Sequence, residues 1–379
     1  MQALRSICFV ATTPFVVNAF LLTHLKALAD LYSVTLCVNC SVYPLSDHID
    51  SRIRVVDLKI AREVSPFRDL RAFLFLLSVF RREKFSAVHS ITPKAGLLAM
   101  LAARCVGIRF RCHTFTGQVW ANRSGIVRYI LKTFDRLIVQ LASNVFTDSP
   151  SQCRFLKKER VVGSDGISVL GPGSISGVDV CRFRPDTESR HQVRAEFDVA
   201  EDQCVFLFVG RLTKDKGIHD LLQAFDKVSA ANPRVELWLV GPDEEGLMDQ
   251  LGRRKLNAPG LVRWLGATSE PERYMASADV LVLPSYREGF GSVIIEAAAC
   301  AIPTVAYRID GVIDAVVEER TGVLVEVGDI EALAVAMLDV SRDRDGRQRL
   351  GSEARDRVSK EFSSAVVTAE WVALYKPLL

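Results

Sequence analysis

The chain has 379 residues, of which 49% are hydrophobic and 25% are charged, and its net charge at pH 7 is +3. This length favours two domains, and the composition excludes a disordered or fibrous protein because it supplies enough apolar surface for two cores. The small net charge conceals an asymmetry: residues 1–170 carry 23 Lys and Arg against 11 Asp and Glu, a net +12, which leaves −9 for the remainder. The basic half is expected to meet an anionic surface or substrate, with a chance spread over solvated faces as the alternative.

Residues 6–25 contain no Asp, Glu, Lys or Arg, a stretch long enough to suggest a transmembrane helix or a signal peptide. We reject both, because Thr12 and Pro14 interrupt the stretch and the pattern divides into a buried strand, 7–11, and a helix, 15–29. No other segment is long and apolar enough to span a bilayer. A soluble or peripheral protein is therefore expected.

Short apolar runs alternate with helical patterns along the chain, which is typical of parallel βα units. The segment 171–186 is rich in Gly, Pro and Ser and is the expected linker, and 364–379 is expected to form a helix. Six strands in each half predict two similar doubly wound domains. They are expected at 7–11, 34–38, 87–90, 109–113, 144–147 and 167–170, and then at 205–210, 235–241, 262–265, 280–284, 304–307 and 322–325.

Nine cysteines, most of them in or beside apolar stretches, fit a reducing cytosol. Cys37 and Cys40 have CxxC spacing, but neither a second pair nor a His cluster accompanies them. A coincidence at a strand end is therefore favoured over zinc or redox chemistry.

The turn after the strand 205–210 reads GRLTKDKG and ends where a helix, 218–230, is expected to begin. Arg211 and Lys216 lie five residues apart around this turn. Two cations beside a helix N-terminus suit a pyrophosphate, although an exposed basic turn is the alternative for this motif alone.

The loop after the strand 280–284 carries the most specific pattern, SYREGFGSVIIE. Glu288 falls in the loop, and Glu296 lies in the first turns of the helix that follows. Gly289 and Gly291 let the backbone approach a ligand and leave amides at the helix start open to phosphate or sugar oxygens. One carboxylate can accept two sugar hydroxyls and the other a ribose diol; the alternative is a helix-dipole partner and a structural Glu.

Together, GRLTKDKG and EGFGSVIIEAAACAIP about seventy residues later resemble the retaining glycosyltransferases of family 4, which have the GT-B fold of two Rossmann-like domains. The Glu-x7-Glu spacing of Glu288 and Glu296 matches that family's signature. Segments 89–103, 113–120 and 171–179 resemble the bacterial branch that builds capsule, O-antigen and other undecaprenyl-linked saccharides. The resemblance covers essentially the full chain.

The resemblance implies a role for each matching residue. Arg211 and Lys216 match the cations that neutralise the leaving diphosphate, and Glu296 matches the acceptor of the ribose hydroxyls. Glu288 matches the contact to hydroxyls of the transferred sugar. The other matches are the backbone amides of Gly289, Phe290, Gly291, Ser292 and Val293, then Thr268 on the nucleobase side, and His113 near the transferred sugar. The turn after the first strand lacks the family's double glycine, which weakens the expectation of phosphate contact there.

The family mechanism requires no protein nucleophile, because the leaving UDP takes the acceptor proton on the same face and the configuration is retained. Arg211 and Lys216 would then stabilise the charge that develops on the leaving group. No cofactor and no metal is expected. The DxD candidate, Asp343 and Asp345, lies outside any strand-end loop and is interpreted as a solvated helix connection.

Three residues of the first half have a functional and a structural interpretation. His113 is preferred as catalytic because a polar turn with Gly117 follows it at once. His89 ends a strand and Lys94 lies at the next helix start, so both are candidate contacts to the acceptor. A satisfied structural histidine and a solvated lysine are the alternatives.

Residues 68–85 are apolar in the middle and basic at both ends. A core-packed helix is the default, and an interfacial helix at an anionic membrane is the alternative. A second basic element, 123–136 with Arg128 and Lys132, modestly favours the membrane.

These observations predict an α/β chain of the GT-B type. The expected domains are an acceptor-binding domain at 1–172, a nucleotide-sugar-binding domain at 173–361, and a helix at 362–379 that packs back on the first. The expected activity is retaining transfer of a hexose or N-acetylhexosamine from a nucleotide sugar, preferably UDP-linked, to a polyprenyl-diphosphate-linked saccharide. The expected location is the cytoplasm, at the inner face of an anionic membrane.

Competing functions from different classes remain. A nucleotide-sugar epimerase of the same architecture and a glycosyltransferase with a soluble acceptor are the alternatives. A non-catalytic sensor is less favoured, because Arg211, Lys216, Glu288 and Glu296 are all present. Nucleic-acid binding is not expected, because no recognised binding motif accompanies the basic half.

Overall fold

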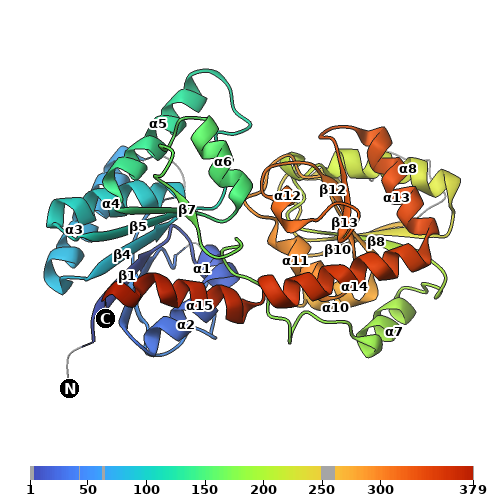
Figure 1. Cartoon of the computed structure of the whole chain (residues 1–379), viewed down its shortest axis with the longest axis horizontal. Coiled ribbons are helices and arrows are strands. Elements are labelled where there is room, and N and C mark those ends of the chain that lie inside the picture. Colours follow the sequence, from blue (N-terminus) through green and yellow to red (C-terminus); the bar gives the residue numbers. More distant parts are fainter. Residues whose placement is uncertain (1–3, 42, 62–64, 249–260, 379) are drawn as a thin grey trace. The chain divides into compact units, whose positions relative to one another are not determined.

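The computed structural model describes residues 4–41, 43–61, 65–248 and 261–378. The chain forms two compact units, Met1–Gly177 with Ser364–Leu379 (unit 1) and Val178–Ser363 (unit 2). Each unit is built on a parallel sheet with helices packed against it (Figure 1). The predicted fold class, two doubly wound Rossmann-like domains, is confirmed.

The sheet of unit 1 has the order β3-β2-β1-β4-β5-β6-β7, so the order reverses between β1 and β4 as in a Rossmann-like sheet. Almost every residue of β1, β2 and β4 is buried, because helices cover both faces of a parallel sheet. The strands are β1 Ser6–Val10, β2 Ser33–Val38, β3 Arg54–Asp57, β4 Ala87–Ile91, β5 Phe110–Phe115, β6 Asn144–Thr147 and β7 Ser168–Val169.

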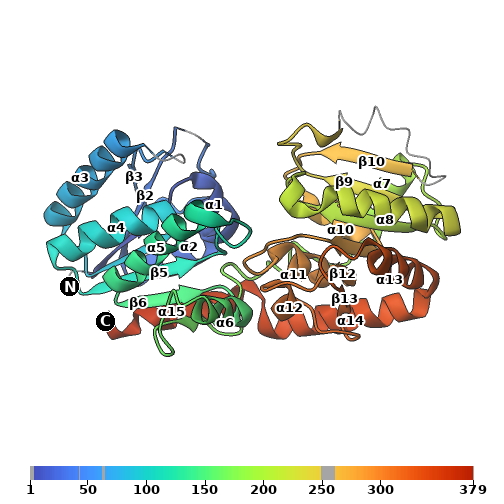
Figure 2. The same ribbon diagram turned by 90° about the horizontal axis from the view of Figure 1, so that it is seen from above.

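The helices of unit 1 fall into two layers. One apolar core joins the sheet to α3 Pro66–Glu83, α4 Pro93–Val106, α5 Gly125–Leu141 and α6 Pro150–Lys158. The other joins it to α1 Pro14–Phe20, α2 Leu22–Ala29 and α15 Ser364–Tyr375, which is followed by the 3-10 turn η2 Lys376–Leu378. Figure 2 shows α3, α4 and α5 side by side, and the core contacts place them on the face opposite α15.

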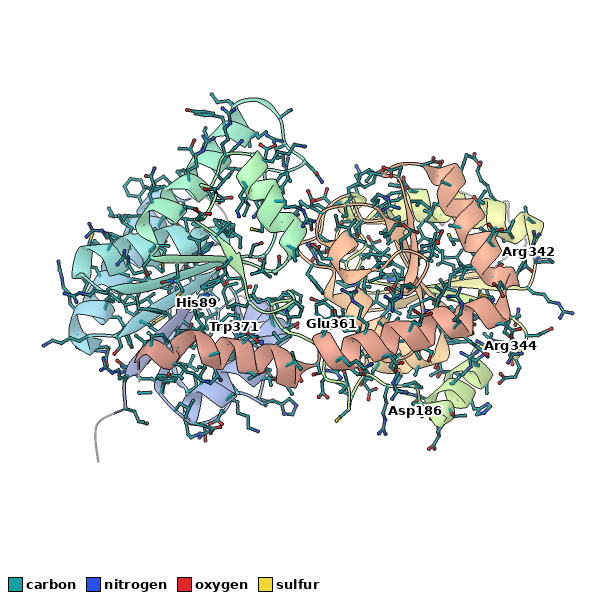
Figure 3. The ribbon with its side chains drawn as sticks, viewed as in Figure 1. His89, Asp186, Arg342, Arg344, Glu361 and Trp371 are labelled. Atoms are coloured by element: carbon teal, nitrogen blue, oxygen red, sulfur yellow. The ribbon has the colours of Figure 1, made fainter. Side chains whose placement is uncertain are left out.

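Helix α15 is bound to unit 1 by a stack of buried aromatic rings. The indole of Trp371 stacks on the imidazoles of His24 and His89, with ring centroids at 5.1 and 4.9 Å. Figure 3 labels Trp371 and His89. The hydroxyl of Tyr375 lies 2.5 Å from Nδ1 of His89, and Oγ1 of Thr368 lies 2.8 Å from Nδ1 of His24. The end of the chain is therefore part of the core of its first unit.

Unit 2 has the sheet order β10-β9-β8-β11-β12-β13, which reverses between β8 and β11. Its strands are β8 Cys204–Val209, β9 Val235–Val240, β10 Leu261–Gly266, β11 Val280–Leu283, β12 Thr304–Tyr307 and β13 Gly322–Val325. Its helices are α7 Thr187–Glu196, the 3-10 turn η1 Lys214–Lys216, α8 Ile218–Ala231, α10 Pro271–Ser277, α11 Ser292–Ala299, α12 Val312–Ala315, α13 Ile330–Arg342 and α14 Arg344–Glu361.

Each predicted strand has a counterpart, but three elements differ from expectation. The short, mostly exposed strand β3 was not predicted, because RVVD lacks an apolar run. The helix expected at 15–29 is two helices that meet at Leu21. The strand expected at 167–170 has only the two residues of β7, at the edge of the sheet.

The predicted linker contains the first passage of the chain from one unit to the other, between Gly177 and Val178. The chain passes back between Ser363 and Ser364, and Val178 pairs with Ser363 in an isolated parallel bridge. The linker ends at Asp186, whose side chain caps α7. Within the described ranges, no helix is long and apolar enough to cross a membrane.

Candidate active site

The two predicted motifs follow the two strands at the switch point of unit 2. The cationic loop 210–217 follows β8, and the acidic loop 284–291 follows β11, its neighbour in the sheet. Since the strands are parallel, both loops leave the same edge of the sheet. Ligands of open α/β sheets bind at such an edge, outside the carboxyl ends of the strands.

Close backbone contacts hold the two loops together. Gly217 has φ +70°, and a Cβ atom there would lie 2.0 Å from the carbonyl oxygen of Pro284. The amide of Tyr286 donates to the carbonyl oxygen of Asp215 at 2.9 Å. A residue larger than glycine at 217 would separate the loops, so this glycine serves the approach of backbone to backbone.

The approach brings Lys216 and Glu288 into direct contact. Nζ of Lys216 lies 2.5 Å from Oε1 of Glu288, and the two side chains are only 19% and 13% exposed. The cation predicted for the diphosphate and the carboxylate predicted for the sugar therefore form one partly buried ion pair. The sequence does not reveal this contact, since the residues are 72 positions apart.

Arg211, the second predicted cation, is paired with a residue that we did not predict. Its guanidinium donates to Oε2 of Glu244 at 2.8 Å, and the two side chains are 39% and 43% exposed. Glu244 lies in the loop after β9, next in the sheet to β8. An ion pair this exposed contributes little, so an anion in the site can replace Glu244 at small cost.

The start of α11 offers backbone donors rather than side chains. Gly291 precedes the helix with φ +80°, and no side chain caps the helix. The Phe290 side chain is buried, so its contact with a ligand is restricted to the backbone. Uncapped amides at a helix start suit an anion or sugar oxygens, as the sequence predicts for Ser292 and Val293.

Glu296, one turn into α11, is a carboxylate in a poor environment for charge. Burial raises the pKa of Glu296 to about 7; the Arg182 guanidinium lowers it and the Glu272 carboxylate raises it. In the described part of the chain no hydrogen-bond donor reaches this carboxylate. A diol that donates two hydrogen bonds would satisfy it.

The nucleobase side was predicted around Thr268, in the loop after β10. There the hydroxyl of Thr268 accepts from the amide of Glu270 at 3.0 Å. Arg182 donates to Glu272 at 2.8 Å and to the carbonyl oxygen of Ser269. Arg182 belongs to the linker segment, and no pattern in the sequence marks it as part of the site.

A further contact missed from the sequence is made by Asp220, in the first turn of α8. Its Oδ2 accepts from the hydroxyl of Tyr286 at 2.6 Å and from that of Tyr307 at 2.7 Å. Tyr286 lies two residues before Glu288, and Tyr307 ends β12. Asp220 thereby ties the acidic loop to the helix that follows the cationic loop.

The two predicted histidines of unit 1 are both buried. His89 is fully buried, and both of its ring nitrogens are occupied, by Tyr375 and by Oγ1 of Thr114 at 2.8 Å. His113 is also fully buried, with Nδ1 2.8 Å from Oγ of Ser90 and its ring against Gly96 of α4. Neither ring is exposed in this structure, although Nε2 of His113 has no hydrogen-bond partner among the described residues. The contacts of His89 favour the structural alternative, and the acceptor role of His89 and the catalytic role of His113 stay predictions.

Three other sequence features have structural explanations. Lys94, the other candidate acceptor contact, is paired with Asp69 of α3 at 2.6 Å. Asp343 of the DxD segment caps α14 by accepting from the amide of Gly346. Cys37 lies 3.6 Å from Cys8 on the neighbouring strand, and Sγ of Cys40 faces the carbonyl oxygen of Val38, so the CxxC pair is not a joint site.

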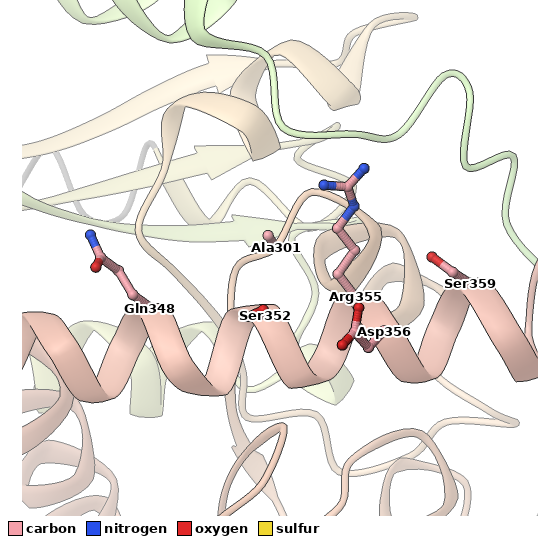
Figure 4. A pocket seen from close by; sticks show the side chains of 6 residues that line it. All are labelled: Ala301, Gln348, Ser352, Arg355, Asp356 and Ser359. Atoms are coloured by element: carbon pink, nitrogen blue, oxygen red, sulfur yellow. The ribbon is translucent and has the colours of Figure 1, made fainter.

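A pocket along α14 contains none of the predicted residues. Figure 4 shows its lining, which comes from α14 and the turn after α11: Ala301, Gln348, Ser352, Arg355, Asp356 and Ser359. It has no counterpart of the Lys216–Glu288 pair or of the uncapped helix start. The switch-point loops are therefore the candidate site.

Comparisons with known proteins identify the family of the chain. Residues 17–173 match the "glycosyl transferase 4-like domain" model, and residues 189–357 match "glycosyl transferases group 1". The capsular polysaccharide biosynthesis glycosyltransferase CapM of Staphylococcus aureus is 30% identical over 85% of this chain and 84% of its own. A UDP-Gal:alpha-D-GlcNAc-diphosphoundecaprenol alpha-1,3-galactosyltransferase of Escherichia coli is 26% identical over 79% of this chain and 78% of its own.

Solved structures agree on the fold. The sucrose-phosphate synthase of Thermosynechococcus elongatus has a TM-score of 0.80 at 21% identity, over 99% of both chains. The Anabaena protein HepE, solved in complex with UDP, has a TM-score of 0.78 at 21% identity over 99% of this chain and 100% of its own. With matched domain models in both halves and a relative aligned along most of its length, this chain belongs to the GT-B glycosyltransferases of family 4, which act on nucleotide sugars.

Proposed function

We propose that this glycosyltransferase moves a hexose or N-acetylhexosamine from a UDP-sugar to a polyprenyl-diphosphate-linked saccharide, with retention of the anomeric configuration. The observation that carries the proposal is the Lys216–Glu288 pair at the switch point, beside the uncapped start of α11. A cation, bare amides and a carboxylate within one loop pair match the diphosphate and the sugar of such a donor.

The donor is divided among the residues of the site. Arg211 and Lys216 bind the diphosphate, and the amides from Gly289 to Val293 contribute donors at the helix start. Glu288 accepts hydroxyls of the transferred sugar. Glu296 accepts the ribose diol, which supplies the two donors that its carboxylate lacks within the described residues. Thr268 lies on the nucleobase side.

Retention is proposed to arise because the acceptor oxygen bonds to the anomeric carbon on the same face of the sugar that the diphosphate leaves, with no protein nucleophile. As the bond from the sugar to the diphosphate breaks, negative charge grows on the diphosphate oxygen, where Arg211 and Lys216 stabilise it. That oxygen then takes the proton of the acceptor hydroxyl on the same face. We propose that this step proceeds without a metal ion; full turnover in EDTA is the expected result, and its loss would refute this part.

The lipid-linked acceptor is proposed from the charge of the first half and from the relatives. The net +12 of residues 1–170 suits an acceptor that carries phosphates and lies in an anionic leaflet. The Escherichia coli relative is described as a transferase to a diphosphoundecaprenol-linked sugar. On this proposal the chain works on the cytoplasmic face of the membrane as a peripheral protein.

The experiment is a transfer assay with a panel of UDP- and GDP-sugars and a synthetic diphosphate-linked GlcNAc on a short polyprenyl chain. We expect one UDP-sugar to be consumed, and NMR of the product to show the anomeric configuration of the donor. Lys216→Ala is expected to abolish transfer without a change in the circular dichroism spectrum. Epimerisation of the donor without an acceptor, or transfer only to a free sugar, would refute the proposal in favour of an epimerase or of a soluble acceptor.

A further inference from the structure

Helix α5 of unit 1 exposes an apolar face without charge. Its water-facing side chains range from 38% exposed at Leu137 to 75% exposed at Ile126. Among the 17 residues of α5, all of them described, every charged side chain is buried or half-buried. The exposed apolar and aromatic residues of this face are Ile126, Val127, Tyr129, Ile130, Phe134 and Leu137.

The charged residues of α5 point away from this face. Arg128 and Lys132 both bind Glu159, at 2.8 and 2.6 Å, and both lie over the ring of Trp120. Asp135 is buried and accepts from the indole of Trp120 at 2.7 Å. The helix thus directs its charges toward the protein and its apolar side chains toward the solvent, the reverse of an ordinary surface helix.

Helix α3 adds a second exposed face that mixes apolar and cationic side chains. Phe67 is 85% exposed, and Leu70, Leu74 and Phe75 are exposed as well. Four exposed arginines lie among or beside them: Arg68, Arg71, Arg81 and Arg82. Both acidic residues of this helix are paired, Asp69 with Lys94 and Glu83 with Arg54 and Arg82.

The two faces belong to one layer of the unit. Helix α4 packs against both α3 and α5, and all three cover the same face of the sheet (Figure 2). Five arginines of the three helices are exposed: Arg68, Arg71, Arg81, Arg82 and Arg104. Each of the three acidic residues of these helices is paired or hydrogen-bonded. This layer therefore presents an apolar and cationic surface.

We propose that the α5 face enters the boundary between headgroups and acyl chains of an anionic bilayer, while the α3 arginines bind its headgroups. The inference rests on the proposed lipid-linked acceptor and identifies the surface that reaches it. An anionic bilayer offers negatively charged headgroups to the arginines of this helix layer and hydrocarbon to its apolar side chains. A second copy of the same surface would instead bring its arginines against like charges.

The two helices contribute differently to the affinity for a membrane. Screening by salt weakens the attraction of the α3 arginines, but it has little effect on apolar side chains that have left water. Binding to anionic vesicles should therefore have a salt-sensitive part from α3 and a salt-resistant part from α5. Each large apolar side chain lost from α5 should lower vesicle affinity about tenfold.

The test uses the full chain in sedimentation with phosphatidylcholine vesicles that contain 30% phosphatidylglycerol. We expect Ile126→Gln, Ile130→Gln and Phe134→Gln combined to lower vesicle affinity at least hundredfold and to abolish binding in high salt. Arg71→Gln with Arg81→Gln and Arg82→Gln should remove the salt-sensitive part alone. Val335→Gln on α13, an exposed apolar residue of unit 2, is the control and should change nothing.

Vesicle binding of the α5 variant equal to that of the unchanged protein would overturn the proposal. The proposal would also be overturned if the unchanged protein did not bind vesicles but formed a dimer in sedimentation velocity, and if the α5 variant abolished that dimer. Transfer to a water-soluble short-chain acceptor separates this inference from the proposed function. The α5 variant should keep its transfer activity with the water-soluble acceptor. If the unchanged protein shows no such transfer but binds vesicles through α5, the proposed function fails and this inference stands.

Discussion

Replacement of Glu288 by Gln should tighten the binding of UDP while it impairs transfer. In the structure the Glu288 carboxylate holds Lys216 at 2.5 Å, so a diphosphate that arrives at Lys216 must compete with a carboxylate of the same charge sign. Glu288→Gln removes that competitor and keeps the shape of the side chain. Lys216 is then left to the ligand.

The expected magnitude follows from the geometry of the pair. Two unit charges 4 Å apart interact by about 4 kcal/mol at an effective dielectric constant of about 20. Since the side chains are 19% and 13% exposed, water recovers part of this energy, and we expect a net gain of about 1–2 kcal/mol, or about tenfold in the Kd of UDP. Transfer should fall about hundredfold, because Gln is a weaker acceptor of sugar hydroxyls than a carboxylate.

Isothermal titration with UDP at low salt measures the first effect, and initial rates with a saturating acceptor measure the second. Glu244→Gln is the matched control, because its pair with Arg211 is about 40% exposed and its loss should change Kd less than about threefold. Unchanged or weaker UDP binding by Glu288→Gln would refute the proposed competition. Equal gains in both variants would show that the effect is one of net charge and not of this contact.

Three further predictions concern other parts of the molecule. Burial raises the pKa of Glu296 to about 7, so its carboxylate becomes protonated and a weaker acceptor of the ribose hydroxyls as pH falls below 7. Nucleoside binding should therefore weaken below pH 7 and be constant above it. Titration with uridine measures this, and Glu296→Gln should remove the pH dependence. Asp220→Asn should lower kcat/KM about tenfold, and the double variant with Tyr286→Phe should lose no more than either single variant. Additive losses in this double-mutant cycle would contradict the linkage of the two loops. Burial lowers the pKa of His24 to about 4 and of His89 to about 3, so both histidines take up protons at higher pH in the unfolded chain than in the folded one. The free energy of unfolding should therefore drop by roughly 3 kcal/mol or more between pH 6.5 and 4. Urea titrations that show equal stability at pH 7 and 5 would argue against this.

The elements of the fold could be predicted from the sequence because the buried strands of a parallel sheet consist of short continuous runs of apolar residues. Every strand of unit 2 was predicted to within a few residues, since turn residues bound each run. The strand β3 was missed because its residues Arg54 to Asp57 lie at the sheet edge, where side chains need not be apolar. The break at Leu21 was missed because the apolar periodicity continues through it.

The candidate site was predictable in its members but not in its contacts. Arg211, Lys216, Glu288 and Glu296 carry a pattern of charge and spacing that a sequence displays directly. The pairing of Lys216 with Glu288 depends on which strands are neighbours, and this is a property of the sheet order.

The burial of His89 and His113 could not be predicted from the sequence. His89 and His113 lie near the carboxyl ends of strands, where the sequence alone does not distinguish a ligand contact from a core contact. Whether such a ring faces solvent depends on what packs over it. For His89 this is Trp371, 282 positions later in the chain, which no local pattern can indicate.

The two passages of the chain between the units make unit 2 an insertion in unit 1. Val178–Ser363 is continuous in sequence, whereas unit 1 is completed only by residues from Ser364 onward. During synthesis from the N-terminus, unit 2 is therefore complete before the last helix of unit 1 is available. Until Trp371 arrives, His24 and His89 lack the indole that stacks on them, and the apolar face around Ile7 and Phe9 lacks its cover. A premature stop before residue 364 would thus damage the unit that was made first and leave the later one whole.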